Sequence, residues 1–166
     1  MAGLESGISI VTFKPQFAAG VVAVILPIQQ EEFGIPISLD TQPDIQDIGA
    51  FYQRGSGNFW VALDGSEVVG TLGLLDIGDR QAALRKMFVK AEYRGAQHAV
   101  AFRLLQTLLE WCRERSIREV FLGTTARFLA AHRFYEKNGF DEISRAELPP
   151  SFPVMTVDSR FYRHAL

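Results

Sequence analysis

Apolar and polar residues alternate with a period of two in several short stretches of the chain. Residues 8–13 alternate in this way and are rich in β-branched side chains, which is typical of a strand. Residues 58–63 and 67–76 are apolar runs separated by Asp64-Gly65, a dipeptide that favours a tight hairpin turn. Further strands are predicted over residues 82–89, 117–123, 140–143 and 154–160. The pattern thus predicts seven strands.

Other stretches have the helical period. Residues 99–115 form the clearest amphipathic pattern, with one apolar stripe that includes Leu104, Leu108 and Cys112. Residues 128–138 predict a second helix, ended by Gly139 in a left-handed conformation. These two helices fall between predicted strands, so we expect them to cover a sheet.

The first third of the chain predicts two more helices. Residues 16–30 are apolar on nearly every side, and Pro27 should kink or stop this helix because proline lacks a backbone donor. Thr41 and Asp44 have the spacing of a capping box, which would open a helix that ends near Gly55. The order of elements indicates an α/β (α+β) fold, with about four helices flanking a mixed sheet.

Composition limits the protein classes that fit this chain. The 166 residues, 48% hydrophobic and 22% charged, predict one globular domain over 1–166. We expect no membrane segment, because the longest apolar stretch is too short to span a bilayer and contains proline. The single cysteine, Cys112, excludes an internal disulfide and makes the cytoplasm the simplest location. Without a zinc-type ligand spacing, no metal is expected.

Charge is distributed unevenly along the chain. Residues 15–53 contain five acidic residues and no Lys, Arg or His, whereas residues 54–166 carry a net charge of +3. An acidic part and a basic part are suited to binding a cation and an anion, respectively. Chance clustering of solvated charges is the alternative explanation.

Residues 87–101 run from a predicted strand, through a loop of small residues, into the long helix. The first turn of a helix has unpaired N–H groups and the positive end of the helix dipole. Arg94 adds a positive charge, and Gly95 allows close approach of an anion to the backbone. This loop is therefore suited to a pyrophosphate. By itself the signal is weak, and the chain contains neither a Walker A sequence nor a dinucleotide fingerprint.

The segments MFVKAEYRGAQHAVAFRLL and AAHRFYEKNGF resemble two motifs of the GNAT superfamily of acetyl-CoA-dependent N-acetyltransferases. The resemblance implies a GNAT-like, mostly antiparallel seven-stranded sheet that splays between its fourth and fifth strands. It also implies direct attack of a primary amine on acetyl-CoA, through a tetrahedral intermediate. Tyr135 would be the catalytic acid that assists the departing thiolate. A backbone N–H near Phe88 or Val89 would stabilise the oxyanion.

The resemblance also implies the binding residues. The coenzyme A or acetyl-CoA site would comprise Met87, Phe88, Val89, Arg94, Gly95, Ala96, Gln97, His98, Ala99, Val100, Ala101, Phe128, Ala131, Phe134 and Lys137. The acceptor, a small-molecule or peptide amine, would lie near Glu31, Glu32 and Phe33. Since the acidic part of the chain contains these residues, we expect a cationic or polar acceptor. No nucleic acid partner is expected, and homodimer formation is left open.

The chain departs from the family pattern at several positions. With a two-residue insertion after Gly95, Ala99 and Ala101 replace the family's glycines; without it, Gln97 and Ala99 do. Alanine retains an N–H for phosphate binding provided that its φ stays negative. Phe128 stands where the family often has asparagine, and the fourth strand has no acid to act as base. These departures support the alternative of a catalytically weak acyl-CoA-binding regulatory or interaction module.

Two further assignments remain open at this level. His98 and His132 are each candidates for the general base, although a surface or packing role is more common for such histidines. A plain nucleotide-binding domain is a second alternative, which predicts that ATP and coenzyme A bind equally well.

Overall fold

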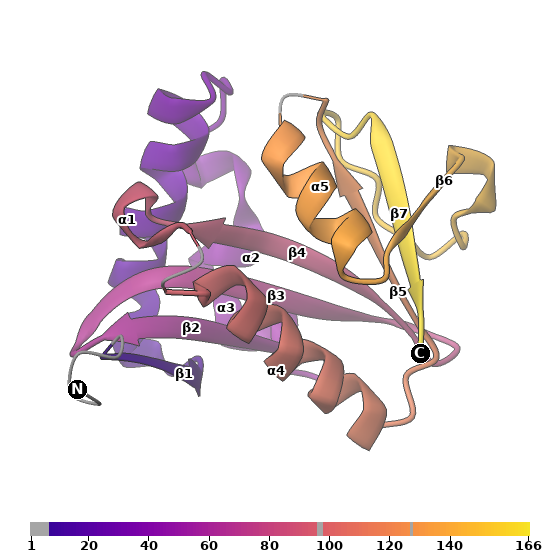
Figure 1. Cartoon of the computed structure of the whole chain (residues 1–166), viewed down its shortest axis with the longest axis horizontal. Helices are drawn as coiled ribbons and strands as arrows, with labels where there is room; N and C mark the ends of the chain where they lie inside the picture. Colours follow the sequence, from indigo (N-terminus) through magenta and orange to yellow (C-terminus); the bar gives the residue numbers. More distant parts are fainter. Residues whose placement is uncertain (1–6, 96–97, 127) are drawn as a thin grey trace.

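The computed structural model describes residues 7–95, 98–126 and 128–166. Their backbone forms one seven-stranded sheet, in the order β1-β2-β3-β4-β5-β7-β6 (Figure 1). The strands are β1 (Ile8–Thr12), β2 (Asn58–Asp64), β3 (Glu67–Gly78), β4 (Gln81–Val89), β5 (Glu119–Thr124), β6 (Asp141–Ile143) and β7 (Arg160–Ala165). Adjacent strands are antiparallel except for the parallel pair β4 and β5. The predicted hairpin is present, with Asp64 opposite Glu67 and Gly65 at φ +61°.

Strands β4 and β5 separate along most of their length. Residues 81–83 of β4 pair with residues 119–121 of β5, and no pairing between the two strands is recorded beyond Ala83. The predicted splay is therefore confirmed. It leaves a wedge between residues 84–89 and 122–124, with the α5 helix beside it (Figure 1).

The helices lie on both faces of the sheet. On one face are α4 (Val100–Glu114) and α5 (Leu129–Lys137); on the other are α1 (Ala18–Pro27), α2 (Pro43–Gln46) and α3 (Ile48–Tyr52) (Figure 1). Two apolar clusters follow this division. Leu104, Leu108 and Tyr135 belong to the first, and Ile25 and Ile48 to the second. Among the described residues, no helix is long and apolar enough to cross a membrane.

The first predicted helix does not stop at Pro27. The α-helical part ends there, but residues 28–32 continue as one wider turn in which the Phe33 N–H donates to the Ile28 carbonyl, five residues back. Proline removes the amide that a regular helix would use, and the wider turn is compatible with that loss. The turn carries Gln29 and Glu32 toward the wedge.

The predicted capping box at Thr41 and Asp44 is wrong. Thr41 ends a short 3₁₀ turn, and its hydroxyl accepts a hydrogen bond from the Ser38 N–H at 3.2 Å. Asp44 is buried and accepts from the Tyr52 hydroxyl at 2.5 Å. The Asp44 carboxylate therefore binds the Tyr52 side chain instead of capping the helix, as the capping-box spacing had predicted.

The predicted strand over residues 154–160 is also wrong. These residues form a loop up to Asp158, and the last strand covers residues 160–165 instead. The Asp158 carboxylate accepts a hydrogen bond from the Met155 N–H at 2.9 Å, which closes the loop on itself. The apolar residues of this segment do not form a strand here, because the Asp158 side chain binds the Met155 N–H that a neighbouring strand would otherwise bind.

Candidate active site

Two cavities meet in the wedge between β4 and β5. The larger, which we call the apolar cavity, has a volume of about 520 Å³ and lies between β4, α5 and the start of α4. The smaller, which we call the charged cavity, has a volume of about 150 Å³ and includes Arg85, Lys86 and Asp158 in its wall. Both are lined by Met87, Phe88, Phe128, Ala131 and Tyr135. A molecule in one cavity can therefore meet a molecule in the other at Tyr135.

Most of the predicted coenzyme residues line the apolar cavity: Met87, Phe88, Val89, Arg94, Gly95, Ala101, Phe128, Ala131 and Phe134. The predicted catalytic Tyr135 lines it as well. Four of the described coenzyme residues do not. Val100 is buried in the core, Lys137 is exposed at the end of α5, and His98 and Ala99 lie outside the wall of either cavity. Ala96 and Gln97 lie outside the described residues.

The predicted acceptor residues are divided between two hollows. Phe33 lines the apolar cavity, where its ring contacts that of Phe128 edge-on at 4.4 Å between centroids. Glu31 and Glu32 line a separate hollow between α1 and residues 90–92. Neither lines the charged cavity, so these two acidic side chains do not form its wall.

Tyr135 is buried and lines both cavities. The ring packs against Phe140 and Tyr162, and the cap at Gly139 (φ +92°) directs the Phe140 N–H back to the Tyr135 carbonyl. The hydroxyl approaches the Met87 sulfur at 3.7 Å, a weak acceptor. Burial raises the pKa of Tyr135, so the phenol stays protonated and can donate a hydrogen bond at neutral pH.

Arg94 lies at the outer end of the apolar cavity and already has two partners. Its Nε donates to the Val89 carbonyl at 2.8 Å, and its guanidinium forms a two-point ion pair with Glu32. The hydrogen bonds from Arg94 hold the pKa of Glu32 below its ordinary value. An anion that binds Arg94 must therefore compete with Glu32.

The start of α4 has a left-handed residue where the family pattern has glycines. Ala99 has φ +50° and ψ 32°, so the condition of a negative φ fails at this position. Among the described residues, no side chain caps the helix N-terminus. The amide groups of the first turn are thus available to an anion, but a strained alanine holds the turn that presents them.

A bulge in β4 brings two adjacent cations into the charged cavity. Thr71 and Gly73 of β3 pair with Phe88 and Arg85, so Lys86 and Met87 together oppose one residue. Lys86 has φ +56°, and its carbonyl accepts a hydrogen bond from the Thr71 hydroxyl at 2.7 Å. Neighbouring side chains of a regular strand point to opposite faces. The bulge overrides that rule, because Arg85 and Lys86 both reach the same oxygen of Asp44.

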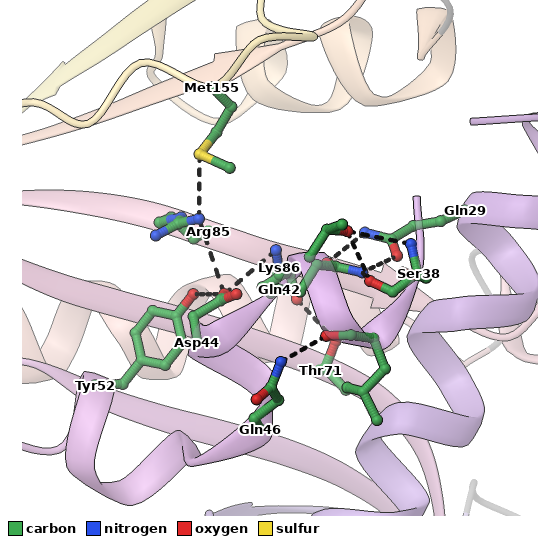
Figure 2. A network of polar contacts seen from close by, with 12 residues as sticks. Gln29, Ser38, Gln42, Asp44, Gln46, Tyr52, Thr71, Arg85, Lys86 and Met155 are labelled. Carbon is green, nitrogen blue, oxygen red and sulfur yellow. Dashed lines mark hydrogen bonds and ion pairs between the residues drawn. The ribbon is translucent and has the colours of Figure 1, made fainter. Parts of the chain in front are cut away.

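Asp44, which does not line the charged cavity, pairs with both cations (Figure 2). Its Oδ2 lies 3.2 Å from Lys86 Nζ and 3.8 Å from the nearest Arg85 nitrogen, and all three side chains are largely buried. Burial lowers the pKa of Lys86 and raises that of Tyr52, although Asp44 opposes the first effect. The short segment around Asp44 is held in turn by reciprocal amide hydrogen bonds between Gln29 and Gln42 (Figure 2).

Asp158 is the one carboxylate among the described residues that line the charged cavity. It packs so closely on β5 that a Cβ atom at Gly123 would lie 2.5 Å from its oxygen. Burial raises the pKa of Asp158, while Arg85 and Lys86 act in the opposite direction. A carboxylate with a raised pKa is a better proton acceptor than an exposed one.

His132 does not line either cavity, and its two ring nitrogens are both engaged. Nε2 is 2.9 Å from the Thr125 carbonyl, and Nδ1 is 2.9 Å from Arg160 Nη1. Because arginine can only donate, these partners assign the neutral tautomer with the proton on Nε2. His132 therefore has a structural role.

Sequence reasoning missed Arg85, Lys86, Asp44 and Asp158. The adjacent cations within an otherwise apolar strand were a usable signal, because a buried strand rarely contains two charges. Asp158 had no such signal, since it lies in the segment predicted to be a strand.

Comparisons with known proteins agree with this geometry. The family model described as acetyltransferase (GNAT) family matches residues 23–140. The chain belongs to the GNAT acetyltransferase family. A GNAT acetyltransferase from Staphylococcus aureus has 38% identity and a TM-score of 0.91, with 95% of this chain and 98% of that one covered. An acetyltransferase from Streptococcus agalactiae has 33% identity, the same TM-score, and coverage of 96% and 99%.

Curated relatives match a shorter part of this GNAT chain. An N-acetylaspartate synthetase from Danio rerio is 35% identical over 106 residues, which cover 63% of this chain and 37% of the relative. N-acetyltransferase 8 from Homo sapiens is 33% identical over 110 residues, 62% of this chain and 47% of the relative. The match thus spans less than half the length of these relatives.

Proposed function

We propose that this protein transfers the acetyl group of acetyl-CoA to the amine of a small molecule. The observation that carries the proposal is that two cavities, one apolar and the other charged, share Tyr135 in their walls. The kinship to proteins named N-acetyltransferases supports it. The charged cavity, at about 150 Å³, favours a small acceptor over a large one.

Three features of the apolar cavity fit coenzyme A. Its walls offer apolar side chains such as Phe134 and Phe128 to the thioester arm. The edge of β4 beyond Ala83 has no partner strand, so its backbone groups can pair with the amides of the arm. Arg94 and the N-terminus of α4 lie at the outer end, where they would bind the pyrophosphate.

Groups from both cavities have roles in this reaction. Acetyl-CoA, when bound, would supply the acetyl thioester. The backbone N–H groups of the β4 bulge would donate to the carbonyl oxygen as it gains charge. Asp158 would accept a proton from the amine, and Tyr135 would donate a hydrogen bond to the departing sulfur. No side chain needs to carry the acetyl group, so the amine attacks directly.

The rival function is an acyl-CoA-binding module with little or no turnover. The departures of the sequence from the family pattern favour it, above all Phe128 in place of the frequent asparagine. The strained Ala99 and the ion pair of Arg94 with Glu32 would weaken coenzyme binding and leave the chemistry at Tyr135, so they do not favour this rival. The rival predicts binding without release of thiol.

Thiol release from acetyl-CoA tests the proposal. The protein is incubated with acetyl-CoA and mixtures of amines, and free coenzyme A and the acetylated amine are both quantified. We expect amine-dependent release and initial-rate plots that intersect, as direct transfer requires. Parallel plots together with an acetylated protein would contradict direct transfer, and binding of coenzyme A without any product would establish the rival function.

A further inference from the structure

We propose that the acceptor carries a carboxylate beside its amine and that Arg85 binds this carboxylate. This inference rests on the proposed function, since it names the class of amine that enters the charged cavity. It reverses the expectation of a cationic acceptor. That expectation depended on the acidic residues of the N-terminal third, and of these Glu31 and Glu32 lie in another hollow.

The position of Arg85 along the cavity supports an acceptor with two polar ends. Tyr135 lies where the two cavities meet, so the reacting amine has to approach that point. Arg85 and Lys86 line the charged cavity but not the apolar one. An acceptor whose amine is at the junction therefore extends its other end toward the two cations.

The charges on this side of the cavity do not cancel. Arg85 and Lys86 share one carboxylate, that of Asp44, and Lys86 is the closer at 3.2 Å against 3.8 Å. Asp44 also accepts a hydrogen bond from the Tyr52 hydroxyl, so Arg85, Lys86 and Tyr52 already share its negative charge. With Lys86 matched to Asp44, Arg85 is left with the longer contact to Asp44 and an electrostatic interaction with Asp158, so its guanidinium can still bind a carboxylate ligand.

The partners of Arg85 are weak ones. One of its terminal nitrogens donates to the Met155 sulfur at 3.4 Å (Figure 2). Its guanidinium carbon lies 5.6 Å from the centre of the Phe51 ring. A thioether is a poor acceptor for a guanidinium, which forms its strongest hydrogen bonds with carboxylates or phosphates. Arg85 is also only 12% exposed, so a carboxylate here would pair with it largely out of water.

Asp158 supplies a carboxylate in the wall of the same cavity. It is the remaining charged residue in the described wall of this cavity, and it stands on the loop that faces β4. Arg85 can bind a carboxylate of the acceptor, and Asp158 can bind its amine. The two side chains therefore match a molecule that carries both groups. An amino acid has that pattern, whereas a polyamine would place a second cation against Arg85 and Lys86.

Matched acceptors test the inference in the wild-type protein. The standard amino acids are compared with their α-carboxamides and with the amines formed by removing the carboxyl group, and putrescine and spermidine represent the polyamines. We expect kcat/KM for the best amino acid to exceed that of its own carboxamide by about 10- to 100-fold. A best acceptor that has no carboxylate would overturn the inference and leave the proposed function intact.

Substitution of Arg85 tests whether this side chain binds the carboxylate of the acceptor. Arg85→Gln should raise KM for the amino acid about 10- to 100-fold, while KM for acetyl-CoA and activity on the carboxamide change little. The loss should be smaller in Arg85→Lys, which keeps the charge but not the planar fork. Equal losses on the amino acid and on its carboxamide would indicate a merely structural role and refute the assignment.

Binding measurements separate the two possible failures. N-acetylated amino acids and their amides are titrated into the protein with coenzyme A present, and thermal stabilisation is recorded. We expect stabilisation by the carboxylates alone, and its loss in Arg85→Gln, even if no amine is turned over. If coenzyme A binds but carboxylates and amides stabilise equally, the inference is wrong whether or not the protein is an enzyme. If acetyl transfer fails but the carboxylates bind through Arg85, only the proposed function falls.

Discussion

The apolar and charged cavities of the wedge are built in different ways. The apolar cavity takes most of its wall from two continuous segments, the end of β4 with the start of α4 and the start of α5. The charged cavity collects its wall from residues 29–37, β4, β5, the start of α5 and the loop before β7. Continuous segments leave a motif in the sequence, whereas assembled walls do not. The coenzyme side was therefore visible in the sequence, and the acceptor side was visible only in the fold.

The largest effect is expected where the two cavities meet. Tyr135→Phe removes only the hydroxyl, so folding and the KM for acetyl-CoA should hold. Acid catalysis contributes about 10²–10⁴-fold, and the fall in kcat should be near the lower end because a thiolate is already a good leaving group. Steady-state rates from pH 6 to 9 provide the measurement. Unchanged turnover with chemistry rate-limiting would make Tyr135 a packing residue.

Asp158 tests the charged side of the comparison. Because its pKa is raised, kcat with saturating acceptor should fall as the pH drops through that pKa, and this acid limb should disappear in Asp158→Asn. We expect kcat at neutral pH to fall about 10- to 100-fold. Pre-steady-state and steady-state pH profiles check both expectations.

A stability control accompanies this variant. A carboxyl whose pKa is raised by folding stabilises the protein below its unfolded pKa, and that contribution is lost as the pH rises through the folded value. Asp158→Asn should therefore not lower Tm at pH 7. A large drop in Tm would attribute the lost activity to damaged structure instead.

Arg94 and Glu32 test the apolar side. Arg94→Ala should weaken the thermal shift caused by coenzyme A, because it removes a cation from the outer end of that cavity. Glu32→Gln should have the opposite sign, with binding several-fold tighter, because it removes the competing carboxylate. Titration calorimetry of both variants provides the test. If Glu32→Gln weakens binding, Glu32 positions Arg94 rather than competing for it.

The smallest effect concerns the start of α4. Ala99→Gly removes the strain of a left-handed alanine, which should raise the free energy of unfolding by about 1–2 kcal/mol. Glycine also increases the conformational entropy of the unfolded chain, which should lower the free energy of unfolding by about 0.4–1 kcal/mol. The net stabilisation should be about 0.5 kcal/mol, measured by denaturant unfolding. Ala101→Gly is the matched control, since a glycine within the helix should destabilise the protein. Stabilisation by both substitutions would contradict this account of Ala99.

The sheet was largely predictable because its signals are local. The hairpin at Asp64-Gly65 and the cap at Gly139 depend on dipeptide geometry, and both are confirmed. Asp44 and residues 154–160 were mispredicted for different reasons. The buried Asp44 carboxylate binds the Tyr52 hydroxyl, which the fold brings to it, whereas the Asp158 carboxylate closes a local turn by accepting a hydrogen bond from the Met155 N–H.

The candidate site divides in the same way. Tyr135 and the residues of the apolar cavity follow from two motifs of contiguous sequence. Arg85 and Lys86 are adjacent in the sequence, and alternation along a strand would separate them to opposite faces. A bulge opposite Leu72 and a positive φ at Lys86 bring them together, and neither feature is encoded by a glycine that a reader of the sequence would notice.

The short pairing of β4 with β5 has a consequence for the motions of the whole chain. The sheet is in effect two blocks, β1–β4 and β5–β7, joined along a seam of three residue pairs at one end. Such a seam lets the blocks open and close as units, and local opening governs how fast backbone amides exchange with solvent. A molecule bound in the wedge contacts both blocks and therefore holds them together. Coenzyme binding should therefore slow amide exchange in β5 and β7, far beyond the residues it contacts.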